Sequence, residues 1–363
     1  MVALAAEQSI SEKILGGERI SAAEALELYR WPLAELGALA NERRNRAKRA
    51  SFNERGEEIV TYIVDRNINY TNVCNVYCKF CAFYRTEKDA DHYVLSFEQF
   101  DQKLDELSAE GGVQILMQGG HHPKLPFRWY IDLLQHIRAK YPHINIHGFS
   151  PPEFQHFAEV FQMPLREVIR QFKAAGLGSI PGGGGEILVD RVRQRISPLK
   201  CNSDAWLEVM QIAHEEGLNS SATMMFGHVE TIEDRIEHLQ RLRDQQDASG
   251  GFTAFICWTF QPENTVLKVK RPTGVAEYLR MQALSRIFLD NFPNVQSSWV
   301  TQGPHIGQIA LKYGANDFGS VMMEENVVSS AGTTFRLNAA DIEQLIREAG
   351  YEPRRRNNWY ELL

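Results

Sequence analysis

The chain of 363 residues has no apolar run near the ~20 residues that a membrane-spanning helix needs. Its first residues also lack the basic and apolar segments of a secretory signal peptide. Acidic residues outnumber basic ones by 46 to 39, so no overall positive field favours nucleic acid or an anionic membrane. We therefore expect a cytoplasmic protein with neither a nucleic-acid nor a membrane partner.

Cysteine is scarce, and its placement excludes a disulfide framework. Of the five cysteines, Cys74, Cys78 and Cys81 form one cluster, whereas Cys201 and Cys257 stand alone. Three clustered thiols and two isolated ones suit a reducing compartment better than a set of disulfides. We expect Cys201 and Cys257 to be unpaired thiols.

The clustered cysteines form a C-x3-C-x2-C motif directly after the apolar run 62–68. Thiolates select soft iron centres and zinc. A structural zinc site needs a fourth ligand at short spacing, but the nearest histidine, His92, comes eleven residues later. A cubane 4Fe-4S cluster normally takes one Cys per iron, so three cysteines leave one iron open to a substrate or cofactor. The motif therefore predicts a catalytic cluster, with a structural zinc site as the alternative.

From residue 61 onward, short apolar segments alternate with amphipathic ones. Eight segments predict strands: 61–69, 113–118, 143–149, 177–181, 219–226, 251–260, 294–301 and, most faintly, 314–318. The main helical segments are 96–110, 127–140, 154–175, 203–216, 231–246 and 274–291. This alternation predicts a parallel sheet, and eight strands are the number that closes a (β/α)8 TIM-type barrel. An open six-stranded partial barrel is the alternative.

Both ends of the chain read as helical extensions of this α/β barrel. Ser21 and Glu24 form a capping box near the start, and Asn338 and Gly350 bound a helix near the end. No low-complexity linker separates the parts. We therefore expect an N-terminal extension over 1–55, the barrel over 56–335 and a C-terminal extension over 336–363.

Two glycine-rich segments follow predicted strands, on the face where barrel enzymes place their chemistry. Gln118, Gly119 and Gly120 follow the second strand, where glycines allow close approach of the backbone to a ligand or serve a tight turn. Four glycines and Glu186 follow the fourth strand. This loop lacks the Lys-Ser/Thr pair of a phosphate-binding loop. Glu186 is therefore placed either to bind ribose hydroxyls or to interact with a helix N-terminus.

Other polar residues near strand ends are candidates for binding and proton transfer. Arg191 and Arg193 either pair with a carboxylate or form a solvated helix face. Glu153, His228 and Asp317 each lie near the end of a predicted strand, where polar residues are ligand candidates.

Several of these motifs together resemble the radical S-adenosylmethionine (SAM) enzymes of the futalosine pathway to menaquinone. The similarity runs from about residue 15 to the end of the chain and is carried by segments 74–85, 118–123, 150–153, 180–188 and 314–319. Asn75, Val76, Tyr77 and Arg85 match the branch that cyclises dehypoxanthine futalosine. Aminofutalosine synthases and deazaflavin-precursor synthases share part of the pattern and are the alternatives, with an iron-sulfur electron carrier more remote.

The resemblance implies a 4Fe-4S cluster with SAM at its open iron. Reductive cleavage of SAM would give a 5'-deoxyadenosyl radical that takes the C4' hydrogen from the sugar of the substrate, which then closes onto its benzoate ring. A flavodoxin or ferredoxin would supply the electron.

The same resemblance assigns expected roles to residues of this chain. Cys74, Cys78 and Cys81 would hold the cluster. SAM would be bound by Gln118, Gly119, Gly120, Glu186, Arg191 and Arg193. The last proton would go to His228, Asp317 or Glu153, and Arg66, Arg191 or Arg193 would pair with the benzoate.

Overall fold

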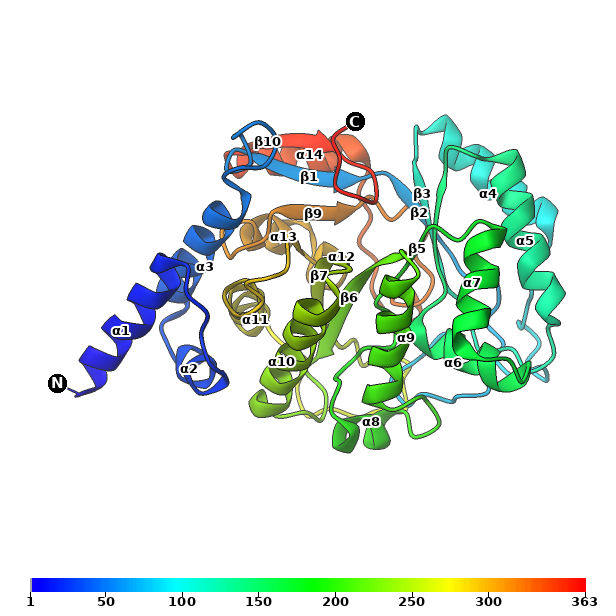
Figure 1. Ribbon diagram of the computed structural model, residues 1–363, viewed down its shortest axis with the longest axis horizontal. Helices are drawn as coiled ribbons and strands as arrows, with labels where there is room; N and C mark the ends of the chain where they lie inside the picture. Colours follow the sequence, from blue (N-terminus) through cyan, green and yellow to red (C-terminus); the bar gives the residue numbers. More distant parts are fainter. Residues whose placement is uncertain (1) are drawn as a thin grey trace.

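The computed structural model describes the backbone of residues 2–363, with side chains from residue 9 onward, and its centre is a parallel sheet (Figure 1). The strands are β1 (Ile59–Ile63), β2 (Asp65–Ile68), β3 (Gln114–Met117), β4 (Asn145–Gly148), β5 (Ser179–Ile180), β6 (Asn219–Phe226), β7 (Phe252–Thr259), β8 (Val295–Gln296), β9 (Asp317–Ser320) and β10 (Glu352–Arg355). Their order is β10-β1-β9-β8-β7-β6-β5-β4-β3-β2.

A single interrupted strand joins the two sides of this sheet. β1 pairs with β9, and β2, which begins after Val64, pairs with β3. At the interruption the carbonyl of Ile63 accepts from Val321 N at 3.1 Å, and that of Val64 accepts from Val113 N at 3.1 Å. The segment 59–68 thus bonds to β9 through its first half and to β3 through its second half. It therefore acts as one of eight barrel strands. The prediction of a TIM-type α/β barrel is confirmed, and the six-stranded alternative is wrong.

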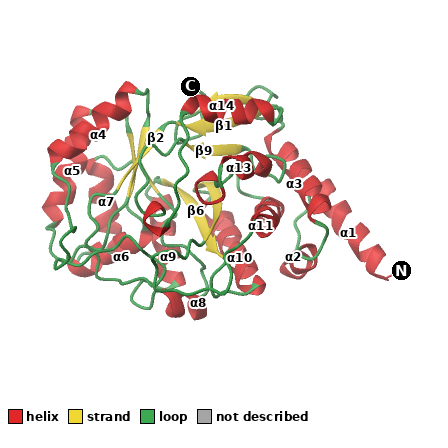
Figure 2. Cartoon of the chain, turned by 180° about the vertical axis from the view of Figure 1, so that it is seen from behind, coloured by secondary structure: helices red, strands yellow, loops and turns green. Residues whose placement is uncertain are grey.

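Helices cover the outside of the sheet, as Figure 2 shows from behind. They are α1 (Val2–Gly16), α2 (Ala22–Leu28), α3 (Leu33–Lys48), α4 (Phe97–Ala109), α5 (Phe127–Lys140), α6 (Pro151–Val160), α7 (Leu165–Ala175), α8 (Asp190–Ile196), α9 (Ser203–Glu215), α10 (Ile232–Ser249), α11 (Val275–Phe288), α12 (Trp299–Gln302), α13 (Pro304–Ala310), η1 (Ser329–Ala331) and α14 (Ala339–Glu348). The predicted capping box at Ser21 is present, as is one at Ser96.

Three features of the secondary structure differ from the sequence prediction. The predicted strand 294–301 is shorter, because β8 covers only Val295–Gln296 and residues 299–301 belong to α12. The segment 154–175 is not one helix, because the chain leaves α6 after Val160 and starts α7 after Pro164. Proline disfavours helical backbone in the residue before it, so it marks this break. The sequence analysis also missed β10, which pairs with β1 outside the barrel.

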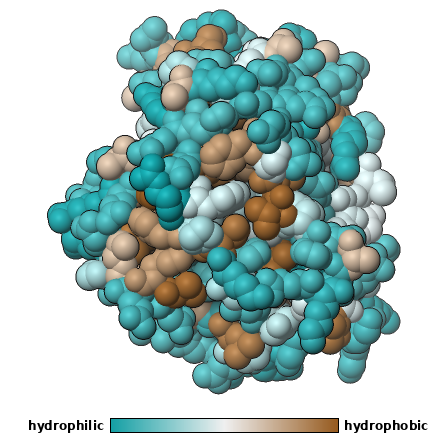
Figure 3. Space-filling model, turned by 90° about the vertical axis from the view of Figure 1, so that its right-hand side faces the viewer, coloured by the Kyte–Doolittle hydropathy of each residue, from teal (hydrophilic) through white to brown (hydrophobic). Residues whose placement is uncertain are grey.

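The core lies between the sheet and its helices. Large buried side chains such as Trp206, Tyr130 and Phe172 fill this layer. Between residues 2 and 363, no helix is long and apolar enough to cross a membrane. The face at the right of Figure 1, which carries α4 and α5, is mainly hydrophilic with hydrophobic side chains gathered near its middle (Figure 3).

The C-terminal tail reaches the interior of the barrel through a buried ion pair. Arg356 is 4% exposed, and its Nε and Nη2 donate to the two carboxylate oxygens of Asp317 at 2.6 and 2.9 Å. Asp317 also accepts from Thr61 Oγ1 at 2.5 Å. The tail is therefore fastened to β9 and β1 by a charge pair that is shielded from water.

We expect Asp317→Ala to lower the free energy of unfolding by about 3 to 5 kcal/mol, because it leaves the Arg356 charge buried without a partner. Urea denaturation followed by circular dichroism measures this loss. As a control, Arg347→Ala removes the exposed pair with Glu343 and should cost less than about 1 kcal/mol. Equal losses in the two variants would contradict the role of the buried pair.

Candidate active site

The three clustered cysteines lie on the loop that follows β2. Cys74 N donates to Arg85 O at 2.9 Å and Asn75 N to His121 O at 3.3 Å, so backbone bonds hold this loop to itself and to the loop after β3. Tyr77, between the first two cysteines, has left-handed backbone with φ 52°. All three thiols are free, and all three face one cavity.

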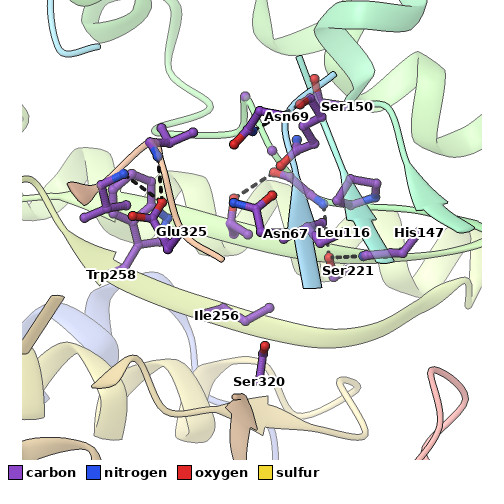
Figure 4. A pocket seen from close by; sticks show the side chains of 18 of the residues that line it. Asn67, Asn69, Leu116, His147, Ser150, Ser221, Ile256, Trp258, Ser320 and Glu325 are labelled. Carbon is purple, nitrogen blue, oxygen red and sulfur yellow. Dashed lines mark hydrogen bonds between the residues drawn. The ribbon is translucent and has the colours of Figure 1, made fainter. Parts of the chain in front are cut away.

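This cavity has a volume of about 420 Å³ and extends from the cysteine loop into the barrel interior. Figure 4 shows part of its wall, with Asn67, His147 and Ser221 among the labelled side chains. Ligand pockets commonly have volumes of this order. Its wall is formed by residues of β1, β2, β3, β4, β6, β7, β8 and β9 and of the loops that follow the strands. Polar lining residues include Asp65, Asn67, Asn69, Gln114, Gln118, His147, Ser150, Ser221, Gln296, Ser320, Glu325 and Arg356. Leu116, Ile256 and Trp258 add apolar surface. The barrel thus contains a hollow whose surface is mainly apolar, with these polar side chains set into it.

Gly119 and Gly120 lie against the start of the cysteine loop. A Cβ on Gly120 would fall 2.1 Å from Val73 O and 2.9 Å from Cys74 Cβ, and one on Gly119 would fall 2.5 Å from the Tyr70 ring. Both positions therefore exclude side chains for reasons of packing. Together with Gln118, these glycines line the cavity beside the thiols.

Glu153 is buried and holds the Gly119 backbone in place. Its Oε1 accepts from Gly119 N at 3.1 Å and Tyr70 OH at 2.8 Å, and its Oε2 accepts from Ser150 N at 2.7 Å and Ser150 Oγ at 2.6 Å. Burial raises the pKa of Glu153, although these hydrogen bonds oppose the shift. Because all of its acceptor directions are used, Glu153 is better placed to position the glycine loop than to accept a proton.

Glu186 ends the four-glycine loop and is held in an unusual conformation. Its backbone φ is +28°, and its side chain is 6% exposed. Oε1 accepts from Lys200 Nζ at 3.1 Å, whereas Oε2 is buried without a hydrogen bond and lies 3.6 Å from Arg193 Nη1. A strained, incompletely bonded carboxylate facing a cavity is a typical feature of a ligand site.

The predicted arginines do not reach this cavity. Arg193 is buried, but it donates to the carbonyls of Gly184, Gly185 and Cys201 and so braces the glycine loop from behind. Arg191 pairs with Asp234 at 2.5 Å on the outer surface. Arg66 pairs with Glu106 and Glu324. Neither of the latter two lines the cavity.

His228 and Asp317 also lie outside the cavity wall. His228 is fully buried, with Nε2 bonded to Met225 O at 3.0 Å and Nδ1 3.0 Å from Glu230 Oε2. Asp317 is taken up by Arg356 and Thr61. The structure therefore brings the cysteines, glycines and two glutamates together, but not these two candidate bases.

Sequence reasoning missed the two cations that do line the cavity, Lys200 and Arg356. Lys200 lies beside Glu186 and 5.0 Å from the Phe80 ring centroid. Burial acts to lower the pKa of Lys200, but Cys78 and Glu186 outweigh it and raise the value. No motif marks either residue, because only the folded chain carries them to the wall.

The donor set fits a cluster better than a single ion. Burial raises the pKa of the Cys74 thiol and raises that of Cys78 to about 12, so these thiols ionise only when a metal replaces their protons. Within the described part of the chain, no three Cys, His, Asp or Glu side chains are arranged to hold one metal ion. A cubane has no such requirement, since each cysteine binds a different iron.

Comparison with known proteins gives the family. Residues 68–242 match the radical SAM superfamily, and residues 249–363 match the CofH/MqnC C-terminal region. The chain is 46% identical over 98% of its length to cyclic dehypoxanthine futalosine synthase of Halalkalibacterium halodurans, covering 94% of that protein. It is also 46% identical to the synthase of the same name in Streptomyces coelicolor, over 98% of this chain and 88% of that one. The chain belongs to the cyclic dehypoxanthine futalosine synthase family of radical SAM enzymes.

Sibling enzymes are similar at lower identity. Aminodeoxyfutalosine synthase of Thermus thermophilus is 36% identical over 97% of this chain and 94% of its own length. The family assignment confirms the resemblance found in the sequence. It also gives the cofactors, since radical SAM enzymes use a 4Fe-4S cluster and SAM.

Solved structures support the fold. Methylornithine synthase (PylB) superposes with a TM-score of 0.73 at 16% identity, over 95% of this chain and 97% of that one. The FeFe-hydrogenase maturase HydG from Carboxydothermus hydrogenoformans gives 0.70 at 17% identity, over 97% of this chain and 80% of that one. Both likenesses are of fold alone.

We predict that Cys74→Ala, Cys78→Ala and Cys81→Ala each abolish cluster binding, because each removes one of only three thiolate ligands. Iron and sulfide analysis after anaerobic reconstitution measures this loss. Cys201→Ala and Cys257→Ala should keep the iron content of the unchanged protein. Loss of iron on changing Cys201 to the same extent as on changing Cys78 would contradict the assignment.

Proposed function

We propose that this chain converts dehypoxanthine futalosine to cyclic dehypoxanthine futalosine for menaquinone biosynthesis. The observation that carries the proposal is the cavity of about 420 Å³ that joins the cysteine loop to the barrel interior, where polar side chains are set into a mainly apolar wall. It offers one continuous space for a cofactor at the thiols and a polar, nucleoside-like substrate beyond it. The two synthases at 46% identity, against 36% for the aminodeoxyfutalosine synthase, favour this reaction over its siblings.

The three cysteines would hold the cluster, which together with SAM would supply a 5'-deoxyadenosyl radical. The protein then has to hold the sugar and the benzoate ring of one substrate molecule within the ~3 to 3.5 Å of a near-attack arrangement. It must also keep water and stray hydrogen donors away. The cavity inside the barrel provides the confined space that the first requirement needs.

In this proposal Gln118, Gly119 and Gly120 contact the amino-acid end of SAM, and Glu186 binds its ribose. Support comes from the position of all four in the cavity wall beside the thiols. Oε2 of Glu186 makes no hydrogen bond and lies 3.6 Å from Arg193 Nη1, so it keeps the capacity to accept from a hydroxyl. We assign Arg193 the role of bracing the Glu186 loop rather than contacting SAM, because its donors are used by the loop carbonyls.

The benzoate carboxylate of the substrate requires a cation as its partner. Lys200 is better placed for this than the arginines suggested by the sequence. Arg356, the other cation of the wall, already makes a bidentate pair with Asp317. Lys200 donates one hydrogen bond to Glu186 and has three N–H donors. The reducing electron is proposed to come from a flavodoxin or ferredoxin in the cytoplasm.

We expect Glu186→Gln to weaken SAM binding by about 1 to 3 kcal/mol, the cost of losing a charged partner from a buried hydrogen-bonded site. Isothermal titration of the reconstituted protein with SAM measures the change. Glu208→Gln, on the exposed face of α9, is the matched control and should bind SAM as before. Unchanged SAM affinity in Glu186→Gln would place the ribose elsewhere.

The reaction itself gives a further prediction. Reduced protein with SAM and dehypoxanthine futalosine should yield a product that lacks two hydrogens of the substrate, with one 5'-deoxyadenosine per turnover. Mass spectrometry distinguishes this from aminofutalosine synthase chemistry, in which the adenosyl group joins an enolpyruvyl benzoate. That adduct, in the absence of a cyclised product, would refute the proposed function.

A further inference from the structure

A chain of hydrogen bonds runs along the inner wall of the barrel, away from the cysteine loop. Ser320 Oγ donates to Asp65 Oδ1, and Gln114 Nε2 donates to Asp65 Oδ2 at 3.1 Å. Asn145 Nδ2 bonds to Gln114 Oε1 at 3.1 Å and to Ser179 Oγ at 3.1 Å. The chain links β9, β2, β3, β4 and β5, and we call it the interior chain.

The interior chain continues to the glycine loop. Ser179 Oγ lies 2.7 Å from His147 Nδ1, and His147 Nε2 lies 3.5 Å from Ser221 Oγ, the contact drawn in Figure 4. Ser221 Oγ accepts from Gly182 N at 3.0 Å. Asp65, Gln114, His147, Ser221 and Ser320 face the cavity. A row of hydrogen-bonded polar groups thus borders the proposed substrate space.

Asp65 differs from the other carboxylates of the cavity. Glu153 accepts four hydrogen bonds, and Glu186 is bound to Lys200. Glu325 accepts from the backbone N–H groups of 327, 328 and 329. The oxygens of Asp65 are bonded only to a hydroxyl and a side-chain amide, both neutral. Among the carboxylates of the cavity wall, Asp65 is therefore the one whose oxygens are paired with neither a cation nor a backbone N–H group.

We propose that Asp65 is the proton acceptor of the cyclisation, with Ser320 and Gln114 holding its carboxylate toward the cavity. This inference rests on the proposed function. It replaces the three bases suggested by the sequence, of which His228 and Asp317 lie outside the wall and Glu153 is saturated with donors.

The step balances in atoms and electrons. When the sugar radical bonds to a ring carbon, that carbon keeps its hydrogen and the ring loses its aromaticity. Breaking this C–H bond returns aromaticity by sending a proton to the Asp65 carboxylate and one electron to a one-electron acceptor. The acceptor is of the iron-sulfur class that the proposed function already contains. The substrate has then lost two hydrogens, one to the 5'-deoxyadenosyl group and one as the proton.

The charges around Asp65 suit this role. Burial raises its pKa to about 6, while the bonds from Ser320 and Gln114 and the charge of Arg356 lower it, and Asp317 raises it. These groups come from β9, β3 and the C-terminal tail, the elements that surround Asp65. A base is most effective when its pKa lies near the working pH. Since the carboxylate is the active form, cyclisation should increase as the pH rises through about 6.

The first test is Asp65→Asn, which keeps the size of the side chain but removes its basicity. Hydrogen abstraction precedes the proton transfer, so 5'-deoxyadenosine should still form when substrate is present. The rate of cyclised product should fall by about 100-fold or more, the lower range of a lost general base. The ratio of 5'-deoxyadenosine to product, followed by liquid chromatography and mass spectrometry, should rise accordingly.

The second test separates chemistry from a structural role and uses a milder change. Ser320→Ala removes a bond that lowers the pKa of Asp65, so the acid limb of the pH profile for product formation should move to higher pH. Ser297→Ala removes another hydroxyl of the cavity wall that bonds to Phe318 O instead, and should leave the limb in place. A merely structural Asp65 would lower activity at every pH without moving this limb.

The outcomes separate the two proposals. If the unchanged protein gives no cyclised product, the proposed function fails. If it does, an acid limb near pH 6 that shifts in Ser320→Ala and a raised product ratio in Asp65→Asn support the inference. A limb that stays in place in Ser320→Ala, or an Asp65→Asn variant that cyclises at the normal rate, overturns it.

Discussion

The rest of the structure depends on one constraint, that the segment 59–68 must pair along both of its edges. Ile63 and Val64, at the interruption between β1 and β2, offer their carbonyls to opposite neighbours. These bonds connect β9 and β3 through one segment of chain, although β2 itself pairs only with β3. They also fix Asp65 inside the barrel and deliver the chain to Cys74 at the end where barrel enzymes bind their ligands. The connection between the two sides of the sheet, the position of the cysteine loop and part of the cavity wall all depend on this one segment.

The closed barrel is not filled in the usual way. A TIM-type barrel normally packs branched apolar side chains across its centre, whereas here Asp65, Gln114, His147 and Ser320 point into a cavity. The buried pair of Arg356 with Asp317 brings the C-terminal tail to this hollow, so the tail contributes part of its wall. A mainly apolar hollow with polar side chains set into its wall suits a radical reaction on a hydroxyl-rich substrate.

Much of this arrangement could be predicted from the sequence because its signals are local. Each of these signals is a short run of neighbouring residues. This holds for the apolar strands, the C-x3-C-x2-C motif and the glycine loop before Glu186. The direction of single side chains depends on the closed barrel and was not predictable. His228 follows a strand as expected, but its ring turns back to Met225 O and Glu230. β10 was missed because Glu-Pro-Arg-Arg has none of the apolar alternation of a strand. Lys200 belongs to no motif, and only folding places it beside Glu186.

The central claim is that the cavity holds one substrate so that its own sugar and ring react. The most direct measurement uses dehypoxanthine futalosine with deuterium at C4' of the sugar. The account predicts that the deuterium appears in 5'-deoxyadenosine and that the cyclised product has lost it. Unlabelled 5'-deoxyadenosine together with a product that keeps the deuterium would contradict the account.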